Sequence, residues 1–364
     1  MNVATVRTDQ TSLTYPIAGR PEQGELMQVA EGVFWVRMAI PIPGLDYINL
    51  WLLEDGEGWT LVDTGLRTPT IRETWERIIE TKLGGKPILR VICTHFHPDH
   101  MGQAGWFAQR FDAPICMTLG EWLFGRCLLL EQQPHPPEAA VTFYRRGGFS
   151  DAELEAYRSR PYDRFAEAVC RLPASFLRIE DGESLHIGGR TWQVIVGRGH
   201  SPEHACLYCA EQGLLISGDQ ILPRITPHIG VYPMEPEADP LRYFLNSLGN
   251  FRGLPPETLV LPAHGDPFRG LSARLDQIGA HHHDRLRDLL AALSTPKTVV
   301  EVLPVLFRRD HSGEHRFLAH GEALAHLHWL QGEGLAERSL SADGFHRFVA
   351  ESGTRDALPD LAPA

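Results

Sequence analysis

Four side chains that can bind a metal ion lie within six consecutive positions of this chain. The segment at residues 94–102 reads T-H-F-H-P-D-H-M-G, and its candidate ligands are His95, His97, Asp99 and His100. An apolar run at residues 88–93 predicts a buried strand that ends just before them. Side chains two positions apart share a face of an extended segment, so His95 and His97 can bind one ion. Asp99 and His100 turn into the following helix and face elsewhere, so the spacing predicts two metal ions rather than one.

Histidines that only pack in the core are the alternative explanation, because the chain has 18 His. Three His and one Asp in six positions, at a strand end and before a glycine, are hard to obtain from packing alone. The sequence H-F-H-P-D-H at residues 95–100 matches the H-x-H-x-D-H signature of the metallo-β-lactamase superfamily. From about residue 24 to residue 275 the chain resembles that superfamily, in particular glyoxalase II-like and lactamase-like hydrolases with a C-terminal winged-helix-like domain. The resemblance implies an α/β fold, a four-layer αββα sandwich.

The resemblance also implies seven ligands in two groups that share one bridging carboxylate. The first site is His95, His97 and His200, the second site is Asp99, His100 and His264, and the bridge is Asp219. The three ligands outside the first motif occur in the steps G-H-S, S-G-D and P-A-H-G. A carboxylate suits the bridge because its negative charge lowers the mutual repulsion of two cations.

Asp63, in the D-T-G step at residues 63–65, resembles a carboxylate that holds a metal-binding imidazole from behind. A ligating histidine needs a carboxylate or a carbonyl on its other ring N–H. The alternative is a turn aspartate that satisfies only backbone donors. We name Asp63 and Asp99 as catalytic candidates, the latter because it can carry a proton to the leaving group.

Two cations about 3.5–4 Å apart can share one water, lower its pKa toward about 7 and hold a bridging hydroxide at neutral pH. Such a site makes a nucleophile without serine or cysteine and stabilises the oxyanion of an attacked carbonyl. We therefore expect two divalent metal ions as cofactors. Zinc is the default for an imidazole-rich set, and iron or manganese fits the same nitrogen and oxygen donors.

Other residues that can bind metals have weaker patterns. His204 is expected to support a ligand or to pack, and Arg198 departs from the Pro-Gly-His step common in the family. The triplet His281 to His283 is expected to lie on an exposed helix face. Cys206 and Cys209 form C-x-x-C inside a predicted strand, where such residues point to opposite faces, so no second metal site is expected there.

Strand and helix signals place the candidate ligands at strand ends of a layered fold. Short strands are predicted at residues 32–38, 47–53, 59–62, 113–117, 191–196, 205–210, 214–217 and 258–261. Apolar residues at helical spacing predict helices at residues 68–83 and 103–111 between the early strands. The alternation of strand and helix indicates α/β layering.

The chain has 364 residues, so we expect one large domain and a smaller one. The predicted units are residues 1–23 as an N-terminal arm, 24–275 as the metal-binding domain, 276–350 as a winged-helix-like domain and 351–364 as a tail. Residues 119–176 are interpreted as a helical insertion. Because it follows the first ligands, we expect it to form a lid over the site; a helical pair packed elsewhere is the alternative.

A net charge of −12 opposes tight binding to a polyanion, so nucleic acid is not an expected partner. No apolar run approaches the length of a membrane span, and no N-terminal signal pattern is present. The six dispersed cysteines do not form a disulfide framework. We expect a cytoplasmic protein with reduced cysteines, a small-molecule substrate and no membrane partner; a homodimer is one assembly that it could form.

These features favour hydrolysis of an ester-type bond in a small molecule, with a thioester (acyl-CoA or acyl-glutathione) or a lactone as first choices. Opening of a β-lactam ring is not expected, because fold does not fix substrate. An endoribonuclease stays open, and it requires Arg145, Arg146, Arg308 and Arg309 on one surface beside the metals. A mono-iron sulfur dioxygenase also stays open, and metal analysis separates it. A metal-free regulatory binder is the weakest alternative, because the ligand set is complete.

Overall fold

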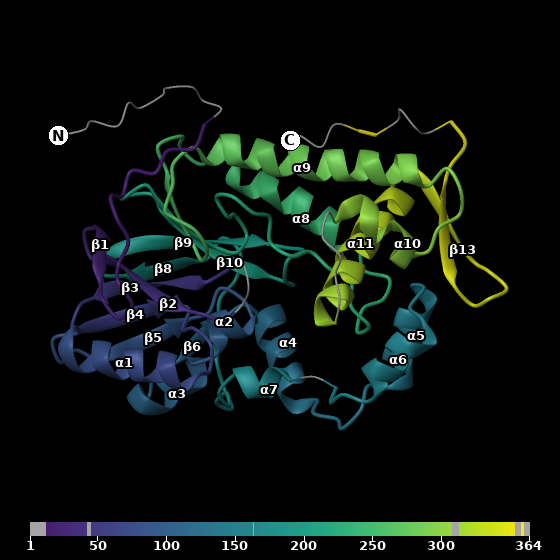
Figure 1. Ribbon diagram of the computed structural model, residues 1–364. Coiled ribbons are helices and arrows are strands. Elements are labelled where there is room, and N and C mark those ends of the chain that lie inside the picture. Colours follow the sequence, from purple (N-terminus) through teal and green to yellow (C-terminus); the bar gives the residue numbers. More distant parts are fainter. Residues whose placement is uncertain (1–11, 42–44, 163, 308–312, 354–357, 360–364) are drawn as a thin grey trace.

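Two β-sheets form the centre of the molecule in the computed structural model, which describes residues 12–41, 45–162, 164–307, 313–353 and 358–359 (Figure 1). The first sheet has its strands in chain order: β1 (Met27–Ala30), β2 (Val33–Ala39), β3 (Tyr47–Asp55), β4 (Gly58–Val62), β5 (Ile88–Ile92), β6 (Ile115–Met117) and β7 (Leu177–Arg178). Neighbours from β1 to β4 are antiparallel, and those from β4 to β7 are parallel.

The second sheet has the order β12-β11-β10-β9-β8. Its strands are β8 (Ser184–Ile187), β9 (Arg190–Gly197), β10 (His204–Cys209), β11 (Leu214–Gly218) and β12 (Leu259–Pro262). Only the pair of β11 and β12 is parallel among these neighbours. The strands predicted from the sequence therefore form two separate sheets, as a four-layer αββα sandwich requires.

The sheets pack face to face, and helices cover both outer faces, so the expected four-layer αββα sandwich is confirmed (Figure 1). Between the sheets, Trp35 and Trp51 from the first sheet share a buried cluster with Trp192 from the second. Outside the first sheet lie α1 (Pro69–Thr81) and α3 (Ala104–Phe111). Outside the second sheet lie α8 (Pro240–Leu248), the short 3₁₀ turn η1 (Gly249–Phe251) and α9 (Leu271–Ala292).

Helix α1 shows how the sequence sets these layers. It begins after Thr68, whose side chain accepts a hydrogen bond from the Ile71 backbone N–H at 3.2 Å and so satisfies one free donor of the first turn. Ile71, Trp75 and Ile78 recur at helical spacing and are fully buried against the sheet. Trp75 also donates to the Thr64 carbonyl at 2.8 Å, beside the strand end that holds Asp63.

The C-terminal part has the expected order of three helices and a strand pair: α9, α10 (Val299–Leu306), α11 (Glu314–Gly332), β13 (Ala336–Leu340) and β14 (His346–Ala350). Its buried residues, including Phe348, belong to the same apolar cluster as α8 and the outer face of the second sheet. The predicted boundary at residues 275 and 276 falls inside α9, and the division into domains stays a prediction.

The insertion at residues 119–176 is helical as expected, with α4 (Leu119–Leu130), α5 (Glu138–Arg146), α6 (Asp151–Arg158) and α7 (Phe165–Ala168). It divides into two parts. The ring centres of Phe124 on α4 and Phe165 on α7 lie 4.7 and 6.1 Å from the ring centre of Phe96. Phe96 stands in the sequence between two ligand candidates. In contrast, Tyr144 of α5 packs on Phe317 of α11 at 4.7 Å. The expectation that the whole insertion covers the site is therefore wrong for α5 and α6.

Two other predictions need correction or refinement. The triplet His281 to His283 is not an exposed face, because His282 is buried and its Nδ1 lies 3.2 Å from Nε2 of His326 on α11. The described part of the N-terminal arm is packed rather than free, since Thr14 pairs with Arg269 and Arg20 forms an ion pair with Asp266 at 2.6 Å. Within the described residues, no helix combines the length and apolar character needed to cross a membrane.

Asn49 on β3 ties the first sheet to the end of β12. Its Nδ2 donates to the carbonyls of Pro262 and Gly265 at 2.8 and 2.7 Å, and its Oδ1 accepts from Trp35 Nε1 at 2.8 Å. These bonds surround His264 in sequence, and the side chain is buried. One amide thus fixes the position of a candidate ligand relative to both sheets.

We predict that Asn49→Ala lowers the free energy of unfolding by about 2–4 kcal/mol, because it leaves buried donors and acceptors unpaired. Chemical denaturation measures this change. Asn246→Ala is the matched control: this side chain is exposed on α8, and its removal should cost less than about 0.5 kcal/mol. Equal effects of the two substitutions would show that the Asn49 bonds do not hold the sheets together.

Candidate metal centre

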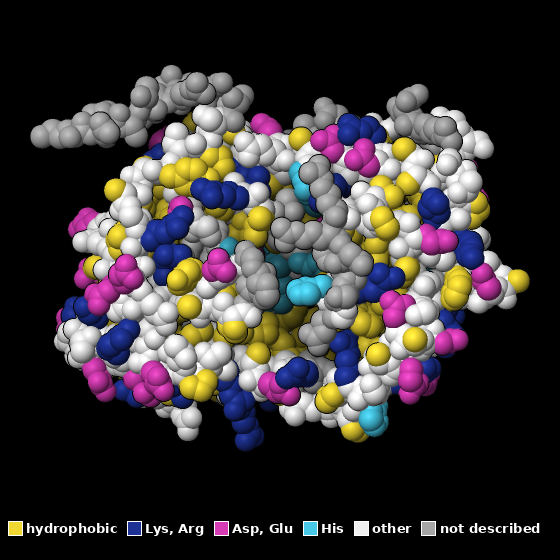
Figure 2. All heavy atoms as spheres, in the orientation of Figure 1, with side chains coloured by type: hydrophobic (Ala, Val, Ile, Leu, Met, Phe, Trp, Pro, Cys, Tyr) yellow, Lys and Arg dark blue, Asp and Glu magenta, His cyan; other side chains and the backbone are white. Residues whose placement is uncertain are grey.

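The candidate ligands gather where strands of both sheets end. Residues 95–100 follow β5, His200 lies in the turn between β9 and β10, Asp219 follows β11 and His264 follows β12. Imidazole side chains are visible at the floor of a hollow in the face shown in Figure 2, with apolar side chains around it. Six of the seven predicted ligands are buried and His97 is half-buried, so the hollow opens on its side.

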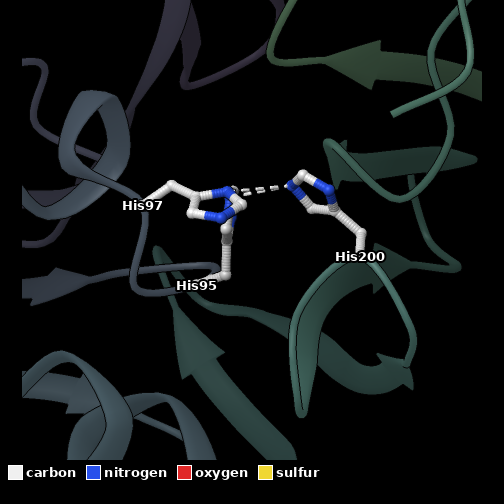
Figure 3. Close-up of side chains that lie close together, drawn as sticks. All are labelled: His95, His97 and His200. Atoms are coloured by element: carbon white, nitrogen blue, oxygen red, sulfur yellow. Dashed lines mark hydrogen bonds between the residues drawn. The ribbon is translucent and has the colours of Figure 1, made fainter. Parts of the chain in front are cut away.

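The first group brings three ring nitrogens to one point (Figure 3). His95 Nε2 lies 2.8 Å from His97 Nδ1 and 3.2 Å from His200 Nε2, and the last two are 3.1 Å apart. Three nitrogens bound to one tetrahedral zinc ion at 2.0–2.1 Å would be separated by about 3.3 Å. The group is therefore already spaced close to a metal-binding arrangement.

The second group joins Asp99, His100 and His264. Asp99 Oδ2 lies 3.3 Å from His264 Nε2 and 3.7 Å from His100 Nε2. The 3.7 Å distance is too long for a hydrogen bond, and the 3.3 Å distance lies at the limit of one. They suit oxygen and nitrogen atoms that share a cation.

Asp219 lies between the two groups, where the predicted bridge belongs. Its Oδ2 is 3.5 Å from His200 Nε2 of the first group and 3.6 Å from His100 Nε2 of the second. Its Oδ1 faces His264 Nε2 at 3.5 Å. The structure thus brings all seven predicted ligands together, and their binding of metal stays a prediction.

The chemistry of these atoms fits divalent cations. His100 Nε2, His264 Nε2 and Asp219 Oδ1 are buried and have no hydrogen-bond partner among the described residues. Buried polar atoms without partners cost about 1–3 kcal/mol each, so a protein rarely keeps three of them side by side. A cation that accepts their lone pairs removes this cost.

Bonds on the outer ring nitrogens fix which atom faces the centre. The Nδ1 atoms of His200 and His264 lie 2.7 and 2.9 Å from the carbonyls of His228 and Tyr47. A carbonyl only accepts, so each Nδ1 carries the proton and each Nε2 offers its lone pair inward. His95 Nδ1 lies 3.0 Å from the Thr94 hydroxyl, which donates its own hydrogen to Asp63 at 2.9 Å and can therefore accept from the imidazole.

Asp63 supports His100 from behind and also binds backbone. Its Oδ2 lies 2.8 Å from His100 Nδ1, and its Oδ1 accepts from the Thr94 backbone N–H at 2.8 Å. Both roles considered from the sequence are therefore present together. Asp63 has a φ of 59°, in the left-handed region that few non-glycine residues occupy, so the site tolerates local strain to aim this carboxylate.

Charge differs between the two groups. Burial and the nearby imidazoles hold the pKa values of His95 and His97 well below the usual value, so these two rings are neutral. Burial also lowers the pKa of His100, but the carboxylates of Asp63, Asp99 and Asp219 outweigh it and raise that pKa well above the usual value. The second group therefore has the stronger demand for positive charge, which a proton or a cation can supply.

His204 is placed behind the ligands, as expected. Its Nε2 accepts a hydrogen bond from the Asp219 backbone N–H at 3.1 Å, and its ring stacks on His95 at 4.8 Å. Burial lowers the pKa of His204 to about 3, which keeps the ring neutral and able to accept. Gly218 makes this contact possible, because a Cβ there would lie 2.5 Å from the His204 ring. Cys206 and Cys209 point into different apolar clusters, as predicted.

Sequence reasoning missed Glu121 on α4. Its buried carboxylate accepts bonds from the Phe96 N–H at 2.9 Å, the Ser201 hydroxyl at 2.6 Å and the Glu203 N–H at 2.7 Å. Phe96 lies between two ligands and Ser201 follows another, so one carboxylate clamps both ligand loops. Burial raises the pKa of Glu121 to about 7 against these three donors. The signal was one acidic residue inside an otherwise apolar helical run, L-G-E-W-L-F.

The loop after Asp219 connects the centre to the C-terminal helices. His228 gives its carbonyl to His200, and its Nδ1 lies 3.4 Å from Glu322 of α11. Three residues further on, the Val231 N–H donates to the Gly321 carbonyl at 3.0 Å. Helix α11 therefore holds the loop that orients a candidate ligand.

Comparisons with known proteins cover nearly the whole chain. The sequence profile described as "Metallo-beta-lactamase superfamily" matches residues 43–264, and "Metallo-beta-lactamase-like, C-terminal domain" matches residues 286–351. A solved β-lactamase domain protein from Burkholderia ambifaria is 41% identical, with a TM-score of 0.86 over 94% of this chain and 99% of that one. The "Probable metallo-hydrolase YqjP" of Bacillus subtilis is 25% identical over 83% of this chain and 93% of its own length.

Two further relatives have names that state a substrate. The human "Acyl-coenzyme A thioesterase MBLAC2" is 24% identical over 53% of this chain and 64% of its own length. A "Linear primary-alkylsulfatase" from a Pseudomonas strain is 23% identical over 84% of this chain and 61% of its own length. Both similarities are lower than that to the Burkholderia protein.

We predict that Glu121→Gln weakens metal binding by about tenfold to a hundredfold, the usual effect of removing a group that orients ligands. The NH₂ group of glutamine would face a backbone N–H whose hydrogen bond the carboxylate now accepts. Two donors cannot bond to each other, so one ligand loop must shift. Competition with a chelator measures the affinity.

Glu131→Gln, at the C-terminal end of the same helix, is the control, because its carboxylate contacts only Cys127 and Gln133 among the bonds found in the described residues. Unchanged metal affinity in Glu121→Gln would rule out the clamp.

Proposed function

The chain belongs to the metallo-β-lactamase superfamily of metal-dependent hydrolases, and on that premise we propose that it binds two divalent ions and cleaves an ester-type bond of a small molecule. Thioesters are the first class of substrate and lactones the second. The observation that supports two ions is the position of Asp219 between two complete ligand groups. Zinc is the first choice for the metal, and iron or manganese suits the same donors.

Different residues of this chain have different roles in such a reaction. Bound ions supply a nucleophilic water at neutral pH and stabilise developing negative charge. Asp99 faces the second group through Oδ2, which leaves its other oxygen to take a proton and deliver it to the leaving group. Asp63 and Glu121 keep the imidazoles in position and do not contact substrate.

Apolar side chains beside the ligands suit an acyl group. Phe96 lies 4.5 Å from the His97 ring, and Phe124 and Phe165 extend the same wall. His97 is the half-buried ligand, so the ligand nearest to solvent lies beside one of these rings. The similarity to an acyl-coenzyme A thioesterase supports the same choice.

Alkyl sulfate esters are a further candidate beside thioesters and lactones, because the similarity to the linear primary-alkylsulfatase extends over more of this chain than the thioesterase match does. A ribonuclease has less support. Arg145 and Arg146 lie on α5, which packs on α11 and not on the ligand loops, while Arg308 and Arg309 lie outside the described residues.

The first prediction from this proposal is two transition-metal ions per chain. His200→Ala should mainly empty the first site and His264→Ala the second, because each removes one ligand of one group. Elemental analysis of protein purified without added metal measures the content. One tightly held ion that Asp219→Ala leaves in place would contradict a bridged pair and favour the mono-iron dioxygenase.

The second prediction is hydrolysis of at least one member of a panel of acyl-CoA, acyl-glutathione, lactone and alkyl sulfate substrates, abolished by His97→Ala. For an uncharged thioester or lactone, kcat/KM should change by less than about threefold between low and physiological salt, since a buried site is weakly screened.

Single-stranded RNA belongs in the same panel as the opposing test. The affinity for RNA falls steeply as the salt concentration rises. The logarithm of the binding constant changes with the logarithm of the salt concentration with a slope of about −0.7 for each phosphate contact. Metal-dependent RNA cleavage that His97→Ala abolishes, without hydrolysis of any ester, would overturn the proposed substrate class.

A further inference from the structure

A cavity of about 290 Å³ lies apart from the ligand residues, where three parts of the chain meet. Helix α5 forms one wall, the loop before α8 forms a second, and α10, α11 and the β13–β14 pair form the rest. Phe143, Pro236 and Phe348 give it apolar surface. Its volume is near the lower end of small-molecule sites, which rules out a macromolecular ligand inside it.

Basic groups converge on one side of this cavity. Arg146 from α5 and Arg338 and His346 from the strand pair all line it. Arg338 is paired with Glu237 at 2.7 Å, but Arg146 has no ion pair among the described residues. The two guanidinium groups are close enough to act on His346, whose pKa is lowered by burial and then by Arg338 and Arg146. A net positive charge therefore remains at the cavity.

A buried histidine without partners forms another part of the wall. His320 on α11 is completely buried, and neither of its ring nitrogens has a hydrogen-bond partner among the described residues. Its ring packs between Phe143 and Phe149 at 5.3 Å, and a Cβ at Gly147 would collide with its Nε2. An apolar residue would fill this place without the cost of two unpaired nitrogens. A ligand that hydrogen-bonds the ring removes that cost.

We propose that this cavity binds a small organic phosphate, with the phosphate against Arg146, Arg338 and His320 and an apolar body against the aromatic wall. Guanidinium groups recognise phosphate through paired N–H donors, and a neutral imidazole adds one more donor. The same chemistry has two sources. The phosphate belongs either to a separate ligand or to the carrier of a thioester substrate, and the second case rests on the function proposed above.

Calorimetric titration of the full-length, metal-loaded protein with phenyl phosphate, in buffer free of phosphate and sulfate, tests this site. We expect a binding event that phenol does not produce and that is separate from any binding of phosphate at the metal centre. Arg146→Met should weaken it at least about tenfold, the effect of one charge-assisted bidentate contact. Arg145→Met is the matched control: this neighbour pairs with Asp151 at 3.0 Å, does not line the cavity and should leave the affinity within about twofold.

His320→Phe gives a second, independent variant. It keeps an aromatic ring between Phe143 and Phe149 and removes only the nitrogens, so the fold should be kept while phenyl phosphate binds several-fold more weakly. Because phosphate can also bind at a metal centre, the contrast between variants decides. Equal affinity in the wild type, Arg146→Met and Arg145→Met, or no binding at all, would overturn the site.

Kinetics then separate the two sources. If the phosphate belongs to a carrier, Arg146→Met raises KM for an acyl-CoA and leaves KM for an uncharged N-acetylcysteamine thioester unchanged. If it belongs to a separate ligand, neither KM changes while phenyl phosphate binding is lost. The calorimetric result stands even if no thioester is hydrolysed, so failure of the proposed function and failure of this site give different outcomes.

Discussion

The strongest constraint on this molecule is to hold seven candidate ligand side chains, six of them buried, with their lone pairs aimed at one another. Three imidazole nitrogens lie about 3 Å apart, and beside them the buried atoms His100 Nε2, His264 Nε2 and Asp219 Oδ1 have no hydrogen-bond partner among the described residues. Such a cluster is unfavourable by itself, because buried polar groups need partners. Such a cluster is stable only if the surrounding chain holds the outer nitrogen of each ring and a cation binds the inner atoms.

The supports behind the rings explain much of the architecture. The Tyr47 carbonyl comes from the first sheet, the His228 carbonyl from the loop between β11 and α8, and Asp63 from the end of β4. Glu121 adds a clamp from the insertion, and Asn49 fixes the segment around His264. Each support comes from a different element, so the packing of both sheets, the insertion and the C-terminal helices sets the geometry of one small volume.

Local sequence signals predicted the features that depend on residues close together in the chain. The strand before His95 and the helix at residues 68–83 follow from the periodicity of apolar residues, and the ligands followed from a family signature. Contacts between segments far apart in the sequence could not be predicted in this way. The burial of His282 depends on His326 of another helix, and α5 turned out to pack on α11 through Tyr144 and Phe317. Glu121 was missed because a single acid in an apolar helix identifies burial but not the two loops that it binds.

The bonds between α11 and the loop at residues 228–231 have a consequence for how this protein could have evolved. Since Gly321 and Glu322 hold the loop that orients His200, the C-terminal helices are not an appendage that gene fusion or loss can exchange freely. A descendant that lost them would need new partners for that loop before the gene segment disappeared. Such mechanical dependence between segments favours inheritance of the two matched regions together and in the same order.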